Sequence, residues 1–200
     1  MNLRADLALI SDWIKPGARI LDLGCGDGTL LKHLRDTMNV SGYGIEIEQS
    51  NIVKCIESGI NVIHNDLDEG INNFFDADSF DYVVMTQALQ AIRHPEQLLD
   101  EVLRVSSDAI ITFPNMGYWT NRVQLALGGH MPVTKSLPNY WYNTPNIHLC
   151  TLYDFENLCK QLDIRIIKRH VVDSQHKHNW LAKLFPNLFG EIAIYHITKK

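Results

Sequence analysis

The chain has 200 residues, of which 46% are hydrophobic and 20% charged, and its formal net charge is −5. This composition predicts one globular domain over residues 1–200 with a full core. The negative charge and the lack of Lys or Arg clusters argue against a nucleic-acid partner, and no apolar run approaches the ~20 residues of a membrane span.

The first predicted elements lead into a glycine-rich loop. Apolar residues at helical spacing predict a helix over residues 2–14, which we expect to act as a lid, and Pro16-Gly17 ends it. The apolar run at residues 19–23 is typical of a buried parallel strand. The sequence DLGCGDGT at positions 22–29 follows, and a helix is predicted from residue 29 to 37. The pattern is a strand, a tight loop and a helix start.

The spacing of Gly24, Gly26 and Gly28 indicates what this loop can hold. Glycine lets a backbone bend or approach a ligand closely, and a helix start presents unpaired N–H groups. The dinucleotide pattern GxGxxG does not fit, because the third glycine comes one position early, and a P-loop is excluded because no Gly-Lys-Ser/Thr follows. The DxGxGxG pattern is similar to motif I of class I S-adenosylmethionine (SAM) methyltransferases. An ordinary strand-to-helix turn is the alternative.

That resemblance implies a SAM site with the methionine half of the cofactor on the loop. The methionine half of SAM carries a cationic sulfonium and an ammonium group. A nearby carboxylate stabilises these charges, which is the role implied for Asp22, the acid of the motif. The implied cofactor-binding residues of the loop are Asp22, Gly24, Cys25 and Gly26.

A second strand, predicted over residues 39–47, brings an acid to the same edge. Glu46 lies near its carboxyl end, ~20 residues past the glycine loop, where an acid can accept both ribose hydroxyls of a nucleoside. We therefore expect Glu46 and the adjacent Ile47 to bind cofactor. Glu48 is the less well placed competitor, and a surface glutamate at a strand end is the alternative.

The third strand, predicted over residues 61–64, leads into the acidic loop NDLDEG at positions 65–70. An acid directly after this strand can accept from an adenine amine while the next N–H donates to the ring. The family pattern places these roles on Asp66 and Leu67. Asp68 and Glu69 leave open an acidic loop that is only solvated.

The remaining predicted elements complete an α/β order. Helices are predicted over residues 50–59, with Ile52, Val53 and Ile56 inward and Gly59 at the end, and over residues 95–105, with Leu98, Leu99, Val102 and Leu103 inward. Strands are predicted over residues 80–85 and 109–113. The alternation predicts a doubly wound parallel sheet. Residues 86–90, TQALQ, occupy the position of methyltransferase motif IV but contain no general base.

A long connection over residues 115–150 is the unusual segment. It contains a predicted helix at residues 119–127 and five aromatic residues: Tyr118, Trp119, Tyr140, Trp141 and Tyr142. Long insertions are more often functional than accidental, and this composition is typical of a binding site or an interface. A lid packed by its own aromatics is the alternative. His148 is either an acid/base group or, as we favour, a structural histidine bonded to a backbone carbonyl.

The C-terminal quarter predicts a capped helix over residues 151–162, a strand over 164–172, a loop over 173–189 and a last strand over 190–197 that forms an antiparallel hairpin. His170, His176 and His178 lack a Cys or acid to complete a tetrahedral set, so we expect no metal. The four cysteines form no CxxC and follow no signal peptide, which favours reduced thiols in the cytoplasm.

Several blocks resemble the MetW family of methionine biosynthesis proteins over nearly the whole chain. The most particular are MTQALQ at positions 85–90 and TPNIHLC at positions 144–150. The resemblance implies a Rossmann-like class I methyltransferase fold, with a seven-stranded mostly parallel sheet and the insertion after strand five. It also implies a role in methionine biosynthesis with a homoserine O-acyltransferase as partner. SAM, which is made from methionine, would be a regulatory ligand.

A SAM-dependent methyltransferase acting on a small molecule is the alternative function. In that case Tyr118, Tyr142 or His148 would position the methyl acceptor, and no residue is assigned as catalytic. Motif IV favours the partner role, although transfer from an activated sulfonium can need only proximity and orientation.

Overall fold

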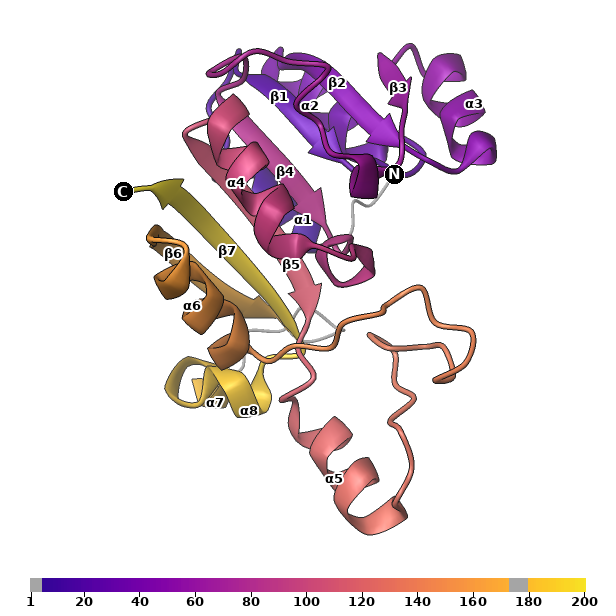
Figure 1. The fold of residues 1–200 in the computed structure, drawn as a ribbon, viewed down its shortest axis with the longest axis vertical. Helices are drawn as coiled ribbons and strands as arrows, with labels where there is room; N and C mark the ends of the chain where they lie inside the picture. Colours follow the sequence, from indigo (N-terminus) through magenta and orange to yellow (C-terminus); the bar gives the residue numbers. More distant parts are fainter. Residues whose placement is uncertain (1–4, 173–179) are drawn as a thin grey trace.

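The computed structural model describes residues 5–172 and 180–200 and contains a twisted sheet of seven strands in these ranges (Figure 1). The strands are β1 (Arg19–Leu23), β2 (Ser41–Glu46), β3 (Val62–His64), β4 (Tyr82–Thr86), β5 (Asp108–Pro114), β6 (Ile164–Val172) and β7 (Ile192–Lys199). Their order is β3-β2-β1-β4-β5-β7-β6, and β7 runs antiparallel to both of its neighbours. The pairs among β1 to β5 are parallel. The predicted mostly parallel sheet with a final antiparallel hairpin is confirmed.

Helices cover both faces of the sheet. They are α1 (Ala5–Ser11), α2 (Thr29–Met38), α3 (Gln49–Glu57), α4 (Pro95–Val105), α5 (Trp119–Gly128), α6 (Leu152–Gln161), α7 (Trp180–Leu184) and α8 (Pro186–Phe189), with short 3₁₀ turns η1 (Leu67–Glu69) and η2 (Leu89–Ala91). Successive strand residues point to opposite faces, so Ile20 joins one buried cluster and Leu21 joins the other. The apolar stripe of α2 packs into the first cluster and that of α4 into the second.

Helix α1 belongs to the core, so our expectation of a lid is wrong for this helix. Ile10 is fully buried and lies in the same cluster as Ile20 of β1 and Leu34 of α2. An apolar stripe on a short N-terminal helix serves equally well as a lid or as core, because helical spacing does not say which surface it covers.

The inward face of α3 was also wrongly predicted. Val53 and Ile56 are 49% and 64% exposed, whereas Cys55 is fully buried. The helix lies at the β3 edge of the sheet (Figure 1), where only a narrow stripe can reach the core. The predicted helix end at Gly59 is confirmed by its left-handed φ of +68°.

The predicted loop over residues 173–189 contains two short helices, α7 and α8, in its described part. Pro186 is the first residue of α8, where its missing N–H has no helical partner to lose and its fixed φ suits the first turn. His176 and His178 lie outside the described residues.

Residues 115–150, which we call the arm, connect β5 to α6. The arm contains α5 and an extended segment without further helices or strands, and it projects from the end of the sheet where β5 terminates (Figure 1). Its return segment is fixed to the domain by His148, whose N–H donates to the Gln90 carbonyl at 2.9 Å. The His148 Nε2 lies 3.2 Å from the Arg93 carbonyl oxygen, which confirms the favoured structural role.

Candidate functional site

The glycine loop joins β1 to α2 and leaves open space beside Gly26. Gly26 has a φ of +56°, a conformation that disfavours any residue with a Cβ, and a Cβ built there would meet no atom within 4 Å. By contrast, a Cβ at Gly24 would lie 3.1 Å from the Cβ of Ala88, and one at Gly28 would lie 3.0 Å from the Cys55 Sγ. Packing therefore holds the two ends of the loop, while its centre has room for a ligand against the backbone.

Glu46 lies directly against this loop. Its Oε2 accepts a hydrogen bond from the Gly26 N–H at 2.8 Å, and its Oε1 accepts from the N–H groups of Ile47 at 2.9 Å and Glu48 at 2.8 Å. The residue is only 8% exposed. A carboxylate offers about four acceptor positions, so three backbone donors leave about one, on Oε2, for a further hydroxyl. The structure thus brings Glu46 and Gly26 together but leaves less acceptor capacity than two ribose hydroxyls require.

Glu48 has a different task, as its side chain caps α3 by accepting from the Ser50 N–H at 3.4 Å. Glu48 is exposed, and its backbone N–H, not its side chain, is what donates to Glu46. Of the two acids at the end of β2, Glu46 is the one that faces the candidate site.

Asp22 and two thiols lie beneath the loop. Asp22 is 1% exposed in β1; burial, and after it the electrostatic effect of Asp22, raises the pKa of the Cys25 thiol. The Sγ atoms of Cys25 and Cys55 are 3.9 Å apart, and the Cys55 thiol donates to the Gly26 carbonyl at 3.2 Å. The side chain of Cys25 packs into the core, so this residue can face a ligand only through its backbone.

Cys55 is a contact of the loop that the sequence did not reveal. Burial raises the pKa of the Cys55 thiol, which therefore stays protonated and acts as a hydrogen-bond donor. Its position in α3, 29 residues from Gly26, carries no motif. The sequence indicates only that Cys55 lies in a predicted amphipathic helix, next to Ile56, which was expected to face inward.

Asp66 and Leu67 follow β3 at the same carboxyl edge. Glu46 pairs with His64 in the sheet, and the Asn65 N–H donates to the Glu46 carbonyl at 3.3 Å, so the two acidic positions lie on adjoining strand ends. The Asp66 Oδ1 accepts from the Asp68 N–H at 3.0 Å and caps η1, while Leu67 is buried. Asp66, the residue expected to accept from the adenine amine, is thus held at the edge of the sheet by the turn that it caps.

Asp68, the acid that left the assignment of Asp66 open, is bound elsewhere. Its Oδ1 accepts from the Arg93 N–H at 2.7 Å, and its Oδ2 lies 3.4 Å from the Arg93 Nε. Asp68 therefore fixes the η1 turn to the segment before α4, which leaves Asp66 as the candidate acid directly after β3.

The motif IV segment holds the strand ends and the arm together. The Gln87 N–H donates to the Thr112 carbonyl at 2.9 Å, and the Gln90 side-chain amide donates to the Pro114 carbonyl at 3.0 Å and to the Cys150 Sγ at 3.3 Å. Gln90 is 2% exposed. The sequence indicated this block as motif IV but not the contacts of Ala88, whose Cβ would lie 3.1 Å from a Cβ at Gly24, or of the Gln90 amide.

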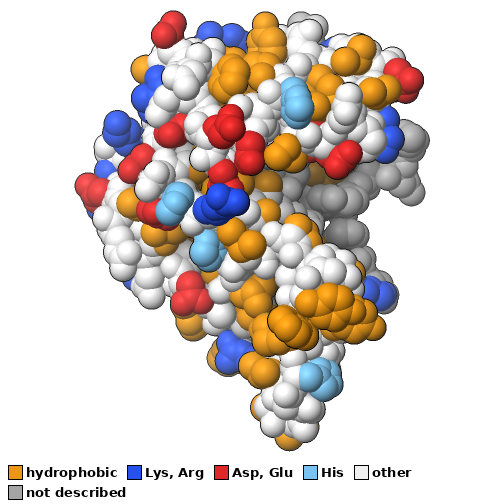
Figure 2. Space-filling model, turned by 45° about the vertical axis from the view of Figure 1, so that its right-hand side comes forward, with side chains coloured by type: hydrophobic (Ala, Val, Ile, Leu, Met, Phe, Trp, Pro, Cys, Tyr) orange, Lys and Arg blue, Asp and Glu red, His pale blue; other side chains and the backbone are white. Residues whose placement is uncertain are grey.

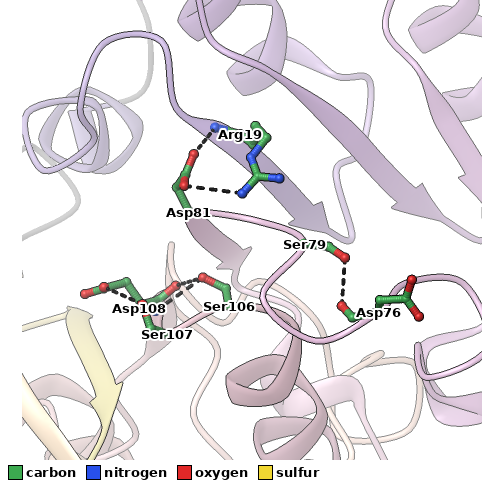
Figure 3. Close-up of polar contacts among 7 residues, drawn as sticks. All are labelled: Arg19, Asp76, Ser79, Asp81, Ser106, Ser107 and Asp108. Carbon is green, nitrogen blue, oxygen red and sulfur yellow. Dashed lines mark hydrogen bonds and ion pairs between the residues drawn. The ribbon is translucent and has the colours of Figure 1, made fainter.

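A second polar group lies at the opposite, amino-terminal edge of the sheet, beside a cleft of about 470 Å³ (Figure 3). The Arg19 N–H donates to Asp81 at 2.7 Å, and the two side chains form an ion pair at 3.6 Å. Asp108 lies 2.6 Å from the His196 Nε2 and accepts from the Ser107 hydroxyl. These contacts connect the start of β1 to the residue before β4 and the start of β5 to β7, so we assign them a structural role.

Among residues 5–172 and 180–200, no group of three or more His, Cys, Asp and Glu residues is arranged to bind a metal ion. Within these same ranges, no helix has the length and apolar character needed to cross a membrane.

The family model of methionine biosynthesis protein MetW matches residues 4–197. The chain belongs to the MetW family. This MetW-family chain is 34% identical over 203 residues to the bifunctional methionine biosynthesis protein MetXA/MetW of Rhodopirellula baltica, a match that covers 97% of the chain and 32% of the relative. It is 30% identical over 94 residues to a phthiotriol/phenolphthiotriol dimycocerosates methyltransferase of Mycobacterium tuberculosis, covering 44% of the chain and 34% of that enzyme. The chain spans about a third of the length of these curated relatives.

Solved structures show the same fold. A SAM-dependent methyltransferase from Archaeoglobus fulgidus has a TM-score of 0.69 and 17% identity, with 98% of the MetW-family chain and 92% of that enzyme covered. A methyltransferase described as putative, from Haloferax volcanii in complex with the Trm112 activator, has a TM-score of 0.68 and 16% identity, with 98% and 89% covered. The predicted class I methyltransferase fold, which is Rossmann-like, is confirmed.

Proposed function

We propose that this chain acts in methionine biosynthesis as the partner and activator of a homoserine O-acyltransferase, in the cytoplasm, and that it binds SAM at the glycine loop. The observation that carries the partner role is the Rhodopirellula baltica relative, in which a MetW part and a MetXA part share one polypeptide. The matched region is 32% of that relative, which leaves most of its length for the other part. Joining two proteins in one chain raises their effective concentration for each other.

The SAM site is supported by the shape of the loop. A Cβ at Gly26 would meet no atom within 4 Å, so the loop backbone has open space beside it, and the Glu46 carboxylate accepts a hydrogen bond from the Gly26 N–H at the same point. The methionine half of SAM would lie on the loop backbone, with Asp22 supplying negative charge below it. Asp66 and the Leu67 N–H would receive the adenine at the adjoining strand end. SAM itself supplies a sulfonium with a transferable methyl group.

A regulatory role for this ligand follows from its origin. SAM is made from methionine, so its concentration reports the output of the pathway that the partner enzyme feeds. A MetW-family chain that binds SAM could adjust homoserine acylation to that output through a difference in affinity between the SAM-bound and free forms.

Methyl transfer to a small molecule is the second candidate, and its support is the fold shared with methyltransferases. The motif IV contacts favour the first candidate. The Gln90 amide already donates to Pro114 and Cys150, and its neighbours in the TQALQ block include no acid, His or Lys that could serve as a base.

The test combines calorimetry and enzyme assays. We expect SAM to release heat on titration into the purified chain, and we expect homoserine acylation by the partner enzyme to be faster with the chain present. No heat at millimolar SAM would overturn the cofactor site. Unchanged acylation together with no complex would overturn the partner role. Product labelled from methyl-labelled SAM and a small acceptor would favour the second candidate.

Matched glycine variants test the position of the site. Gly26→Arg places a long side chain in the open space beside the loop and should abolish SAM binding. Gly17→Arg is the control, since Gly17 also has a left-handed φ, of +75°, and open space around it, but lies beside the opposite edge of the sheet. Retained SAM binding by the Gly26 variant would remove the proposed site.

A further inference from the structure

The arm exposes an unusual share of the apolar surface of the molecule. The structure describes 21 exposed large hydrophobic residues, and 11 of them lie between Trp119 and Leu149. They are Trp119, Val123, Leu125, Leu127, Met131, Val133, Tyr140, Trp141, Tyr142, Ile147 and Leu149. Figure 2 shows hydrophobic side chains gathered on the projecting part of the molecule. Large contiguous apolar patches on soluble proteins mark interaction sites.

Three consecutive aromatic residues form the most exposed part of this surface. Tyr140, Trp141 and Tyr142 are 56%, 75% and 69% exposed. The rings of Tyr140 and Tyr142 stack with centroids 5.7 Å apart, and the Trp141 ring meets Tyr142 edge-on at 5.8 Å. The three rings therefore contact one another while each residue stays more than half exposed. Tyr and Trp side chains are among the residues that most often dominate binding energy at interfaces.

These exposures decide between the two readings of the insertion. A lid packed by its own aromatics would bury Trp141, yet this side chain is three-quarters exposed. The stacking within the triplet covers only part of each ring. The arm is therefore a surface that lacks a cover, and the sequence composition alone could not distinguish these two arrangements.

The charge of the arm differs from that of the rest of the chain. The protein has 23 acidic residues and a net charge of −5, but none of those acids lies within residues 115–150, which carry Arg122 and Lys135. Interfaces are enriched in Tyr, Trp, Met and Arg and depleted in Asp and Glu, which is the composition found here. Two cations are too few to bind a nucleic-acid backbone or an anionic membrane. The surface that would complement the arm is therefore an apolar groove, bordered by acidic residues, on another protein.

We propose that the arm is the surface on which the homoserine O-acyltransferase docks, an inference that rests on the proposed partner role. The Rhodopirellula baltica match covers 97% of the chain, so a relative with the equivalent of most or all of the arm is joined to MetXA in one polypeptide. The exposed triplet enters the apolar groove of the partner, and Lys135 faces its acidic rim.

A second copy of the chain fits the arm less well. Two arms related by a two-fold axis would bring Arg122 and Lys135 of each arm onto a surface that has no acid to pair with them, since residues 115–150 contain no Asp or Glu. An arm docked on the acidic body of another copy would form a head-to-tail contact, which leads to open assemblies unless the rotation closes.

The test compares matched tryptophan variants of the full chain. Trp141→Ala removes the most exposed ring of the triplet, and Trp180→Ala removes a tryptophan that is 67% exposed in α7, outside the arm. Binding of each to the purified acyltransferase is measured by calorimetry, and the mass of each complex by light scattering. We expect Trp141→Ala to weaken binding at least tenfold and Trp180→Ala to leave it within twofold. Lys135→Glu should weaken binding and reduce its dependence on salt.

Each outcome has a distinct meaning. If the wild-type chain binds and Trp141→Ala binds equally well, the docking surface is wrong while the partner role stands. If the wild-type chain does not bind at all, the partner role fails and the inference fails with it. If Trp141→Ala instead dissolves a dimer of the chain and leaves acyltransferase binding intact, a second copy covers the arm and the inference is overturned. Unchanged melting temperatures exclude unfolding as the cause of weaker binding.

Discussion

The Gly26 N–H donates to the Oε2 of Glu46 at 2.8 Å, so the centre of the glycine loop is fixed to the end of the neighbouring strand. The other carboxylate oxygen binds the N–H groups of Ile47 and Glu48, which start the turn after β2. One side chain thus shapes both loops of the candidate site. The position expected to recognise a ligand is also the position that organises the protein.

Replacing Glu46 by Gln should damage both of these roles. A carboxamide retains one acceptor oxygen but presents an NH₂ group to the other backbone donors, so at least one N–H loses its partner. We expect the Glu46→Gln variant to bind SAM at least tenfold more weakly and to lose about 1–3 kcal/mol of unfolding free energy. Calorimetry and urea unfolding measure these changes. Glu48→Gln should leave SAM binding almost unchanged, and equal affinities of the two variants would contradict the assignment.

Gly42 in β2 is required by the backbone of β1. A Cβ at this position would lie 1.8 Å from the Ile20 carbonyl oxygen, and a backbone atom in a buried parallel pair cannot move away as a side chain can. We expect Gly42→Ala to lose at least about 2 kcal/mol of unfolding free energy, because the strands must separate or shift. Urea unfolding checks this.

Ser41→Ala, at the exposed neighbouring position, is the control for Gly42 and should change stability by less than about 0.5 kcal/mol. A Gly42→Ala variant as stable as this control would mean that β2 adjusts without cost.

Where local signals are strong, the sequence predicted which residues of the candidate site lie together. Glycines at alternate positions after an apolar run indicated the loop, and the spacing of ~20 residues brought Glu46 to the same edge as Gly26 because parallel strands end together. The thiol of Cys55 beneath the loop could not be predicted. Its helix covers the edge of the sheet, and three apolar residues nearby gave an equally plausible inward face.

The arm shows a second limit. Its aromatic residues were evident from composition, but a packed lid and an open surface have the same residues. Only the positions of neighbouring atoms distinguish a buried ring from an exposed one, and the arm has few neighbours because it leaves the sheet at the end of β5 (Figure 1). The α7 and α8 helices escaped detection because helices of five and four residues have no readable period.

Buried thiols should make the protein less stable at high pH. Burial raises the pKa of Cys150 to about 11 and that of Cys159 to about 12, from an ordinary value of 9.0. Between pH 9 and the raised pKa of each thiol, the unfolded chain loses a thiol proton that the folded chain keeps. The free energy of unfolding therefore falls as pH rises above 9. Each such thiol contributes at most about 1.4 kcal/mol per pH unit. Unfolding midpoints measured from pH 8 to 11 test this.

The Cys159→Ala variant is informative for this pH dependence. It removes one titrating thiol, so its stability should fall less steeply between pH 9 and 11, although its stability at pH 8 is lower because Cys159 is buried in the core. Parallel slopes for the variant and the wild-type chain would show that this thiol does not titrate as inferred.

The start of α6 is closed by a capping box that connects the arm to the core. The Thr151 Oγ1 accepts from the Asp154 N–H at 3.3 Å, and the Asp154 Oδ2 accepts from the Thr151 N–H at 2.9 Å. Thr151→Ala leaves one helix N–H without its cap and should reduce the free energy of unfolding by about 1 kcal/mol. Thermal or urea unfolding measures the loss.

Thr37→Ala in α2 is the matched control, because the Thr37 hydroxyl bonds back to the His33 carbonyl on an exposed helix surface and caps nothing. It should change stability by less than about 0.5 kcal/mol. If both threonine variants lose the same stability, the loss at Thr151 reflects threonine removal in general rather than the cap. If Thr151→Ala alone is destabilised, the loss is due to the cap. Thr151 directly follows the last residue of the arm, so the cap then stabilises the point at which the arm joins α6.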